Sequence, residues 1–398
     1  MKTIPTWQPI EQPAGPPAVA PVDPAAVDAR RRATYQSYEC FLRGRLAELD
    51  ARRPAQWQRD YSGVDAYVRS IEPLRARLKA MLGFWIEPAD RPALATANLE
   101  TLLEDADFVA RRFNMAVGEG LTTYAVELVP RSPGPHPGLL AQHGYGGTPE
   151  LICGFTAKAN APDYSYRSLG LRAVRRGFHV LAVHHPSGYG TTADEATSVP
   201  NPAAVTHGNY GKNRLHRLAV MAGGTLFGLD MLASSRGIDW LAGRPGVDPR
   251  RIGMYGLSQG GESALYLPAL DPRIRASVCS AYFNSRLPKL IGPHRALSYL
   301  DSNEEDKFFT DVAGCFSDAD LVSLIAPRAF AVEAGLKDSS VDFEGAEAEY
   351  GRARVHYEKL GIPRRIELIA HEEGHVSATS RAFEFLAEQL ACPMTNDQ

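Results

Sequence analysis

The run Gly256-Leu257-Ser258-Gln259-Gly260 holds the side chain best suited to covalent chemistry in this chain. A strand-like segment, 251–255, precedes it and a helix-like segment, 261–270, follows it. A G-x-S-x-G motif between a strand and a helix is the nucleophile elbow of α/β-hydrolases. There the serine takes a strained backbone conformation that lifts its hydroxyl above the sheet, and the glycines make room for the tight turn. The motif therefore predicts Ser258 as a nucleophile.

Two later loops carry the partners that a serine nucleophile needs. In this fold an acid and then a histidine follow the serine along the chain, each after a later strand. Asp338 follows the apolar run that ends at Ala334, and His375 follows the run that ends at Ala370. We expect His375 to move the hydroxyl proton and Asp338 to orient the imidazole. The alternatives are Asp342 and Glu333 for the acid and His371 for the base.

An acyl-transfer enzyme also needs two N–H groups that stabilise an oxyanion. One is expected from Gln259, at the start of the helix, where the dipole favours negative charge. The other is expected from Tyr145, in the glycine-rich loop 143–147 that follows a short strand. The alternative is that this loop only links the strand to the next segment. No substrate-binding residue is predicted.

The segment His371-Glu372-Glu373-Gly374-His375 also matches H-E-x-x-H, a zinc-binding motif of metalloproteases. That motif binds zinc only within a helix, where its histidines lie one turn apart. Here it follows the strand-like run 365–370, and Gly374 would cost about 1 kcal/mol inside a helix. No third ligand follows. We therefore favour the serine hydrolase, with no metal and no cofactor.

Strand and helix signals alternate over residues 105–392, which predicts a mostly parallel sheet with helices on both faces, the α/β-hydrolase fold. A proline- and alanine-rich arm is predicted over 1–27. A helical extension over 28–104 follows, and it is either a cover over the main domain or a contact between copies in a homo-oligomer. A single helix is expected near 218–241, after a long loop at 187–215.

Composition limits the class of protein. The 398 residues carry a net charge of −3, with 44% hydrophobic and 22% charged residues, as in ordinary globular proteins. Neither nucleic acid nor a membrane is expected as a partner. The five cysteines lack C-x-x-C spacing, and the N-terminus lacks the apolar core of a signal peptide. We expect a cytoplasmic protein that acts on a small ester.

The region 247–261, followed by Leu270-Asp271-Pro272-Arg273-Ile274, resembles the elbow of acetyl xylan esterases, cephalosporin C deacetylases and dienelactone hydrolases. The resemblance covers roughly residues 120–390 and implies oxyanion N–H groups from Tyr145 and Gln259. This chain departs from the esterases in having His184-His185-Pro186 in place of their Arg-Gly-Gln motif, Val376 after the histidine, and the N-terminal extension. Dienelactone hydrolases use a cysteine nucleophile. The resemblance thus implies fold and esterase chemistry, not a sugar-acetate substrate.

Three function classes remain. The leading hypothesis is a short-chain carboxylic-ester hydrolase that works through an acyl-enzyme. A serine peptidase or amidase of the prolyl oligopeptidase type shares this catalytic domain, but the N-terminal residues are too few for its propeller domain. A catalytically silent binding protein is the third, and it would not require Ser258, Asp338 and His375 together.

Overall fold

The computed structural model describes residues 23–155, 165–186, 210–292, 298–300, 302 and 304–391. The chain divides into two compact units, residues 1–51 and 52–398. The first unit contains helix α1 (Pro24–Arg52), in which no side chain is buried. This helix agrees with the helical N-terminal extension expected from the sequence, although it begins within the predicted arm. Of the predicted arm at 1–27, residues 1–22 lie outside the described part of the chain.

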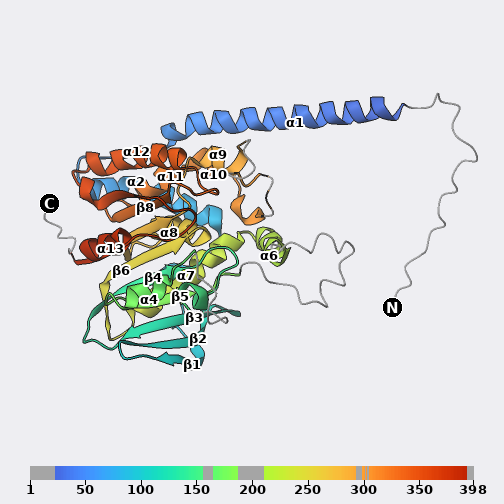
Figure 1. Cartoon of the computed structure of the whole chain (residues 1–398). Coiled ribbons are helices and arrows are strands. Elements are labelled where there is room, and N and C mark those ends of the chain that lie inside the picture. The colour runs from blue at the N-terminus through green and yellow to red at the C-terminus, as the bar shows by residue number, and fades with distance from the viewer. Residues whose placement is uncertain are drawn as a thin grey trace, which may run out of the picture. The chain divides into compact units, whose positions relative to one another are not determined.

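A single sheet forms the centre of the second unit (Figure 1). Its strands are β1 (Thr96–Glu104), β2 (Phe108–Gly118), β3 (Leu121–Pro130), β4 (His136–Gln142), β5 (His179–Val183), β6 (Val247–Leu257), β7 (Ile274–Ser280), β8 (Ala329–Gly335) and β9 (Ile366–His371). They lie in the order β1-β2-β3-β5-β4-β6-β7-β8-β9. The pairs among β1, β2, β3 and β5 are antiparallel, and all others are parallel. The predicted mostly parallel sheet is confirmed.

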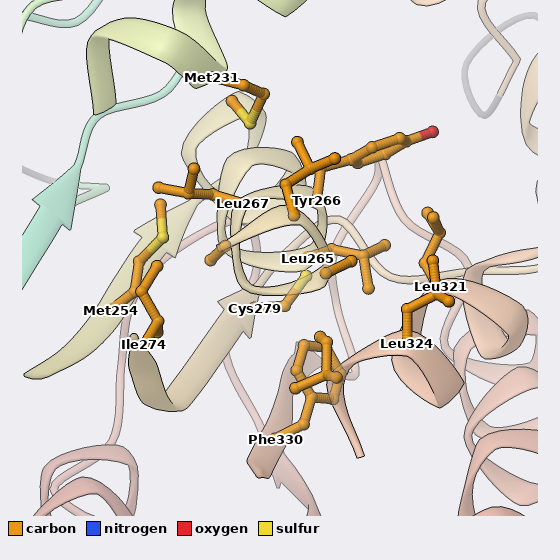
Figure 2. Packing of buried hydrophobic residues seen from close by; sticks show 14 of the residues in the cluster. Met231, Met254, Leu265, Tyr266, Leu267, Ile274, Cys279, Leu321, Leu324 and Phe330 are labelled. Atoms are coloured by element: carbon orange, nitrogen blue, oxygen red, sulfur yellow. The ribbon is translucent and has the colours of Figure 1, made fainter. Parts of the chain in front are cut away.

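Helices cover both faces of the sheet because successive strand residues point to opposite sides. The helices of this unit are α2 (Val64–Leu82), α3 (Pro149–Ile152), α4 (Leu169–Val174), α6 (Tyr210–Met221), α7 (Leu226–Ala242), α8 (Gln259–Leu270), α9 (Arg286–Ile291), α10 (Val312–Cys315), α11 (Asp318–Ile325), α12 (Phe343–Lys359) and α13 (Arg381–Ala391). Met254 packs with α2, α7, α8, α11 and α12 in one hydrophobic cluster. Its neighbour Tyr255 packs with α3, α4 and α13 in the other. Figure 2 shows Leu265, Tyr266 and Leu267 of α8 within the first cluster.

The predicted extension over 28–104 does not form one separate helical part, and residue 105 marks no break in the structure. Tyr67 and Leu78 of α2 are fully buried in the core, and the Tyr67 hydroxyl donates to the Ser323 carbonyl at 2.7 Å. The last nine residues of the extension form β1, which pairs with β2. Helix α2 joins the main domain because its apolar side, which carries Tyr67 and Leu78, is buried in the same core.

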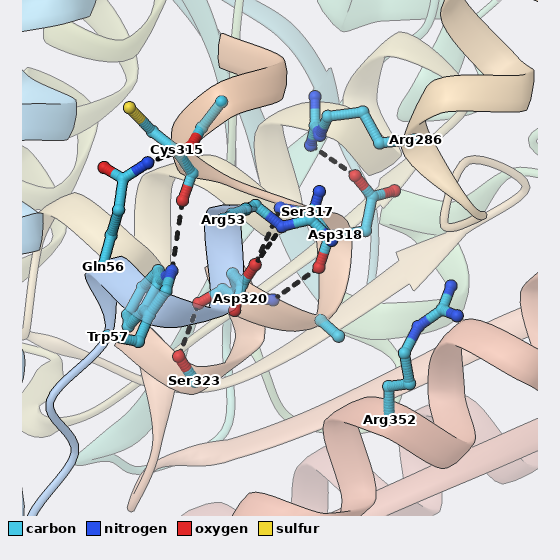
Figure 3. Close-up of polar contacts among 12 residues, drawn as sticks. Arg53, Gln56, Trp57, Arg286, Cys315, Ser317, Asp318, Asp320, Ser323 and Arg352 are labelled. Atoms are coloured by element: carbon cyan, nitrogen blue, oxygen red, sulfur yellow. Dashed lines mark hydrogen bonds and ion pairs between the residues drawn. The ribbon is translucent and has the colours of Figure 1, made fainter. Parts of the chain in front are cut away.

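The segment that leads into α2 is held by polar contacts, shown in Figure 3. A short 3₁₀ helix, η1 (Arg53–Gln56), places Arg53 Nε 2.8 Å from an Asp320 oxygen of α11. The indole N–H of Trp57 donates to the Cys315 carbonyl at 3.2 Å. Asp320 also completes a capping box with Ser317 at the start of α11. These contacts hold residues 53–57 against α10 and α11.

The single helix expected over 218–241 is wrong. The chain forms α6 and α7, which are bent by 95° where the two meet. Gly223 at the break has φ +90°, and the Thr225 hydroxyl caps α7 by accepting the Gly228 N–H at 2.8 Å. Of the predicted loop 187–215, residues 187–209 lie outside the described part of the chain, and 210–215 belong to α6.

The sequence analysis also considered membrane spans and disulfide bonds. In the described part of the chain, no single helix has the length and apolar character of a membrane span; α6 and α7 reach them only as a bent pair. No disulfide joins the four cysteines that the structure describes, Cys40, Cys153, Cys279 and Cys315.

Leu78→Ala is expected to lower the free energy of unfolding by about 3 kcal/mol, because it opens a cavity in the shared core. Leu99→Ala is the matched control, since Leu99 on β1 is 66% exposed and its loss should change stability by less than about 0.5 kcal/mol. Urea unfolding measures both. Equal effects of the two substitutions would show that α2 is not part of the core.

Candidate active site

Ser258 occupies a strained turn between β6 and α8. Its φ of +61° and ψ of −120° are unusual for a residue with a side chain. A Cβ at Gly256 would lie 1.9 Å from the Gly260 carbonyl oxygen, and one at Gly260 would lie 2.0 Å from that of Gln142. Only glycine fits at either position. The geometry is that of the nucleophile elbow predicted from the sequence.

Asp338 and His375 meet at the same edge of the sheet. Asp338 follows β8 and His375 follows β9, and these neighbouring parallel strands end side by side. His375 Nδ1 lies 2.8 Å from Asp338 Oδ2. The Asp338 side chain is 1% exposed, and its Oδ1 accepts the backbone N–H groups of Ser340 (2.8 Å) and Val341 (3.2 Å). The carboxylate is thus held in a position that fixes the imidazole ring.

Ser258 and His375 open onto one cavity of about 290 Å³. Its lining residues are Tyr145, Ser258, Gln259, Ala281, Ser298, Tyr299, Ser302, Glu304, Lys307, Ser340, Val341 and His375. Between the Ser258 and His375 side chains the described structure has no hydrogen bond. Such contacts are often long without substrate and tighten when it binds. The cavity therefore brings together all the predicted site residues except Asp338, which reaches it through His375.

The alternative acid and base residues have other positions. Asp342 caps α12, where its Oδ2 accepts the Gly345 N–H at 2.9 Å. His371 is the last residue of β9, and burial lowers its pKa. The H-E-x-x-H segment therefore runs from a strand into a turn and lacks the helical spacing of the zinc motif. In the described residues no group of three or more metal-binding side chains is present.

The two predicted oxyanion donors, Tyr145 and Gln259, line the cavity, and neither backbone N–H donates to another described residue. The neighbouring N–H groups are occupied: that of Gly144 donates to the Tyr166 hydroxyl at 2.8 Å, and that of Ser258 to the Ser280 carbonyl at 2.9 Å. Gln259 is the first residue of α8, whose first N–H groups have no partner within the helix. The N–H groups of Tyr145 and Gln259 are therefore available as the predicted oxyanion donors.

A neutral histidine braces the loop that carries Tyr145. Burial lowers the pKa of His143 to about 4. Its Nε2 accepts the His185 backbone N–H at 3.2 Å, so its Nδ1 carries the proton and donates to the Gly144 carbonyl at 2.9 Å. The sequence suggested only a glycine-rich turn here. This bracing role depends on a residue 42 positions later in the chain and left no local signal.

Glu333, an alternative acid in the sequence, instead connects the segments that carry Ser258 and His375. It is buried on β8 and does not line the cavity. Its Oε2 accepts the hydroxyls of Tyr255 (2.6 Å) and Ser280 (2.7 Å). Its Oε1 accepts the N–H (3.0 Å) and the hydroxyl (2.6 Å) of Thr379. Ser280 in turn holds the backbone of Ser258, and Thr379 belongs to the loop of His375. Glu333 therefore fixes the elbow relative to the histidine.

Glu333→Gln is expected to lower kcat by about 10- to 100-fold and stability by about 2 kcal/mol, because its amide NH₂ would face donors. Steady-state kinetics and urea unfolding measure the two effects. Glu367→Gln is the control, since Glu367 on β9 pairs only with partly exposed Arg381. A Glu333→Gln enzyme with wild-type kcat would contradict the positioning role.

The far wall of the cavity is charged. Burial lowers the pKa of Lys307, but the nearby carboxylates of Glu262 and Asp306 more than offset this and raise it well above its usual value. Lys307 forms an ion pair with Glu262, and its Nζ lies 3.9 Å from an oxygen of Glu304. The sequence predicted no substrate-binding residue. Lys307 and Glu304 are the charged side chains that the structure adds to the site.

Comparison with known proteins agrees with this geometry. A model described as the Abhydrolase family matches residues 95–365, more than half of the chain. The chain belongs to the Abhydrolase family. Among curated relatives of this Abhydrolase-family chain, YtaP of Bacillus subtilis (strain 168), provisionally named a hydrolase, is 27% identical over 252 residues, which make up 62% of this chain and 75% of YtaP.

Solved structures similar to this Abhydrolase-family chain are esterases by name. One is a protein of Bacteroides fragilis NCTC 9343 that is provisionally named an acetyl xylan esterase. It superposes with a TM-score of 0.59 and 19% sequence identity, and the match covers 79% of this chain and 78% of that protein. Another is a glucuronoyl esterase from Solibacter usitatus, with a TM-score of 0.57 and 15% sequence identity. That match covers 84% of this chain and 95% of the esterase. These likenesses show a common fold. The predicted α/β-hydrolase fold and the prediction of a hydrolase are confirmed, and the fold resembles that of acetyl xylan esterases.

Proposed function

We propose that this chain is a serine carboxylic-ester hydrolase that acts through an acyl-enzyme. The observation that carries the proposal is the 2.8 Å contact between His375 Nδ1 and Asp338 Oδ2, with His375 and the strained Ser258 on one cavity. Neighbouring structures named as acetyl xylan and glucuronoyl esterases support the ester bond as the target.

The mechanism follows from the positions of these groups. Ser258 Oγ attacks the ester carbonyl carbon while His375 Nε2 takes its proton, and Asp338 stabilises the imidazolium. The N–H groups of Tyr145 and Gln259 bind the oxyanion. When the intermediate collapses, the C–O bond to the alcohol breaks and His375 protonates that alcohol. Water, activated by His375, then attacks the acyl-enzyme, and the acid leaves as Ser258 regains its proton.

The cavity favours a small, polar substrate. Its volume of about 290 Å³ leaves room for a short acyl group rather than a long chain. Hydroxyl groups and the charged Glu304 and Lys307 line it beside the rings of two tyrosines, and among the described lining residues only Ala281 and Val341 are purely apolar. A long alkyl chain would have to desolvate these polar groups without forming hydrogen bonds to them.

The test is hydrolysis of p-nitrophenyl esters from acetate to octanoate, with the corresponding acetanilide as the amide. We expect kcat/KM to be highest for acetate to butyrate, at least about 10-fold lower for octanoate, and lower still for the amide. A faster amide reaction would favour the amidase alternative. If no ester is hydrolysed and a fluorophosphonate does not label Ser258, the result would contradict the esterase proposal and favour the catalytically silent binding protein.

Two further sequence predictions remain proposals. A cytoplasmic location fits the absence of disulfides among the described cysteines, and cell fractionation tests it. Self-association through α1 fits its exposed aromatic side chains, Tyr35, Tyr38 and Phe41, and light scattering of the full chain tests it.

A further inference from the structure

Lys212 is a fully buried cation behind the candidate oxyanion hole. It lies in the first turn of α6, its side chain is 0% exposed, and it does not line the cavity. A buried ammonium is costly unless it has partners of opposite charge and hydrogen-bond acceptors. Its Nζ lies 2.8 Å from Asp306 Oδ2, on the 3₁₀ helix η4 (Glu305–Lys307). The ion pair explains how the charge is tolerated but not why it lies here.

The Lys212 ammonium also contacts the two residues that carry the predicted oxyanion donors. Its Nζ donates to Gln259 Oε1 at 3.2 Å, the one hydrogen bond that the Gln259 side chain makes in the described structure. The same Nζ lies 5.4 Å from the centre of the Tyr145 ring, within the range of a cation–π contact. One ammonium thus reaches the side chains of both residues, of which Tyr145 lies in the loop 143–147 and Gln259 begins α8.

The partner of Lys212, Asp306, lies among other charged side chains. Burial raises the pKa of Asp306, but the cations of Lys307 and Lys212 more than offset this, and the net shift is downward. Asp306 therefore remains a carboxylate between two lysines, since its Oδ2 is 3.8 Å from Lys307 Nζ. Lys307 is anchored in turn to Glu262 of α8. The Lys212 ammonium thus forms an ion pair with Asp306 and contacts the side chains of Gln259 and Tyr145.

We propose that Lys212 is a positioning residue that holds Tyr145 and Gln259 in the geometry of the oxyanion hole. This inference rests on the proposed esterase function. Oxyanion stabilisation depends on donors that are already aimed at the developing charge. Loss of one such donor costs about 10²- to 10³-fold in kcat, so loss of the residue that aims two of them is expected to cost about 10- to 100-fold.

The test is Lys212→Met, which removes the charge and keeps most of the side-chain volume. With p-nitrophenyl acetate we expect kcat to fall about 10- to 100-fold while KM changes less than about 3-fold. The inhibition constant of an alkylboronic acid, whose tetrahedral adduct on Ser258 mimics the oxyanion, should rise by a similar factor. Lys212→Arg keeps the charge and should recover most of the kcat.

Two further variants separate positioning from simple loosening of α6. Arg217→Gln removes another ion pair between α6 and η4, from Arg217 Nε to Glu305 Oε2 at 2.8 Å, and should leave kcat unchanged. Gln259→Met keeps the backbone N–H but removes the acceptor for Lys212. The double variant Lys212→Met/Gln259→Met should lose little more than Lys212→Met alone, because both changes break one contact.

The proposal is overturned if Lys212→Met keeps wild-type kcat, if Arg217→Gln causes the same loss, or if the losses of Lys212→Met and Gln259→Met multiply. If Lys212→Met does not fold, Lys212→Arg and Gln259→Met carry the test, and a Gln259→Met enzyme with wild-type kcat and boronate affinity overturns it. A fluorophosphonate that labels Ser258 in every folded variant shows that the proposed esterase function still stands. Failure of labelling in the wild type would instead remove that function.

Discussion

Ser258→Ala is expected to lower kcat for p-nitrophenyl acetate on the order of 10⁴- to 10⁶-fold while the protein stays folded. The substitution removes the oxygen that forms the acyl-enzyme in the proposed mechanism, and what remains of catalysis would come from binding and the proposed oxyanion donors. Alanine must still adopt the φ of +61° at the elbow, so a small loss of stability is expected too.

The measurement combines steady-state kinetics with labelling by a fluorophosphonate, which should modify Ser258 in the wild type and nothing in the variant. Ser277→Ala is the control, because Ser277 is a buried serine on β7 that does not line the cavity. Activity that survives Ser258→Ala but is lost with a chelator would contradict the serine mechanism. It would revive a metal site at His371 and His375.

Asp338→Asn is expected to lower kcat by about 10⁴-fold with little change in fold. An asparagine can still accept the N–H groups of Ser340 and Val341 through its oxygen. Its NH₂ group would then face His375 Nδ1, which must accept rather than donate. The imidazole is forced into the tautomer that carries its proton on Nε2, so it cannot take the proton of Ser258.

Asp342→Asn is the matched control. Asp342 was an alternative acid in the sequence, but it caps α12, and asparagine caps a helix about as well as aspartate. We expect wild-type kinetics and thermal stability within a few degrees. If the two substitutions reduced kcat equally, the assignment of Asp338 as the acid would be wrong. Thermal unfolding of both variants shows whether lost activity is lost structure.

The sequence by itself determined the parts of this protein whose signals are local. The elbow is readable because the strand, the two glycines and the helix of one short segment impose its geometry on Ser258. The positions of Asp338 and His375 follow from strands that end just before them. Helix α2 (Val64–Leu82) lies within the predicted helical extension, and its apolar residues recur at helical spacing. The order of these groups along the chain then implied a serine hydrolase.

Several elements lacked such signals. Strand β7 (Ile274–Ser280) carries serine and cysteine at buried positions, so its apolar pattern is weak, and it was not predicted. The break between α6 and α7 depends on Gly223 and on the contact of Thr225 with the Leu82 carbonyl, 143 residues away. A helical pattern runs through this break because the residues on both sides are apolar.

Only the tertiary structure decided how the site is supported. Glu333 joins Tyr255, Ser280 and Thr379, which come from three separate parts of the chain. Lys212 reaches Gln259, 47 residues away, and Asp306 lies farther still along the chain. The physical reason is the same for both. A buried charge takes its position from partners that the packed sheet brings together, and those partners leave no pattern in the sequence around it.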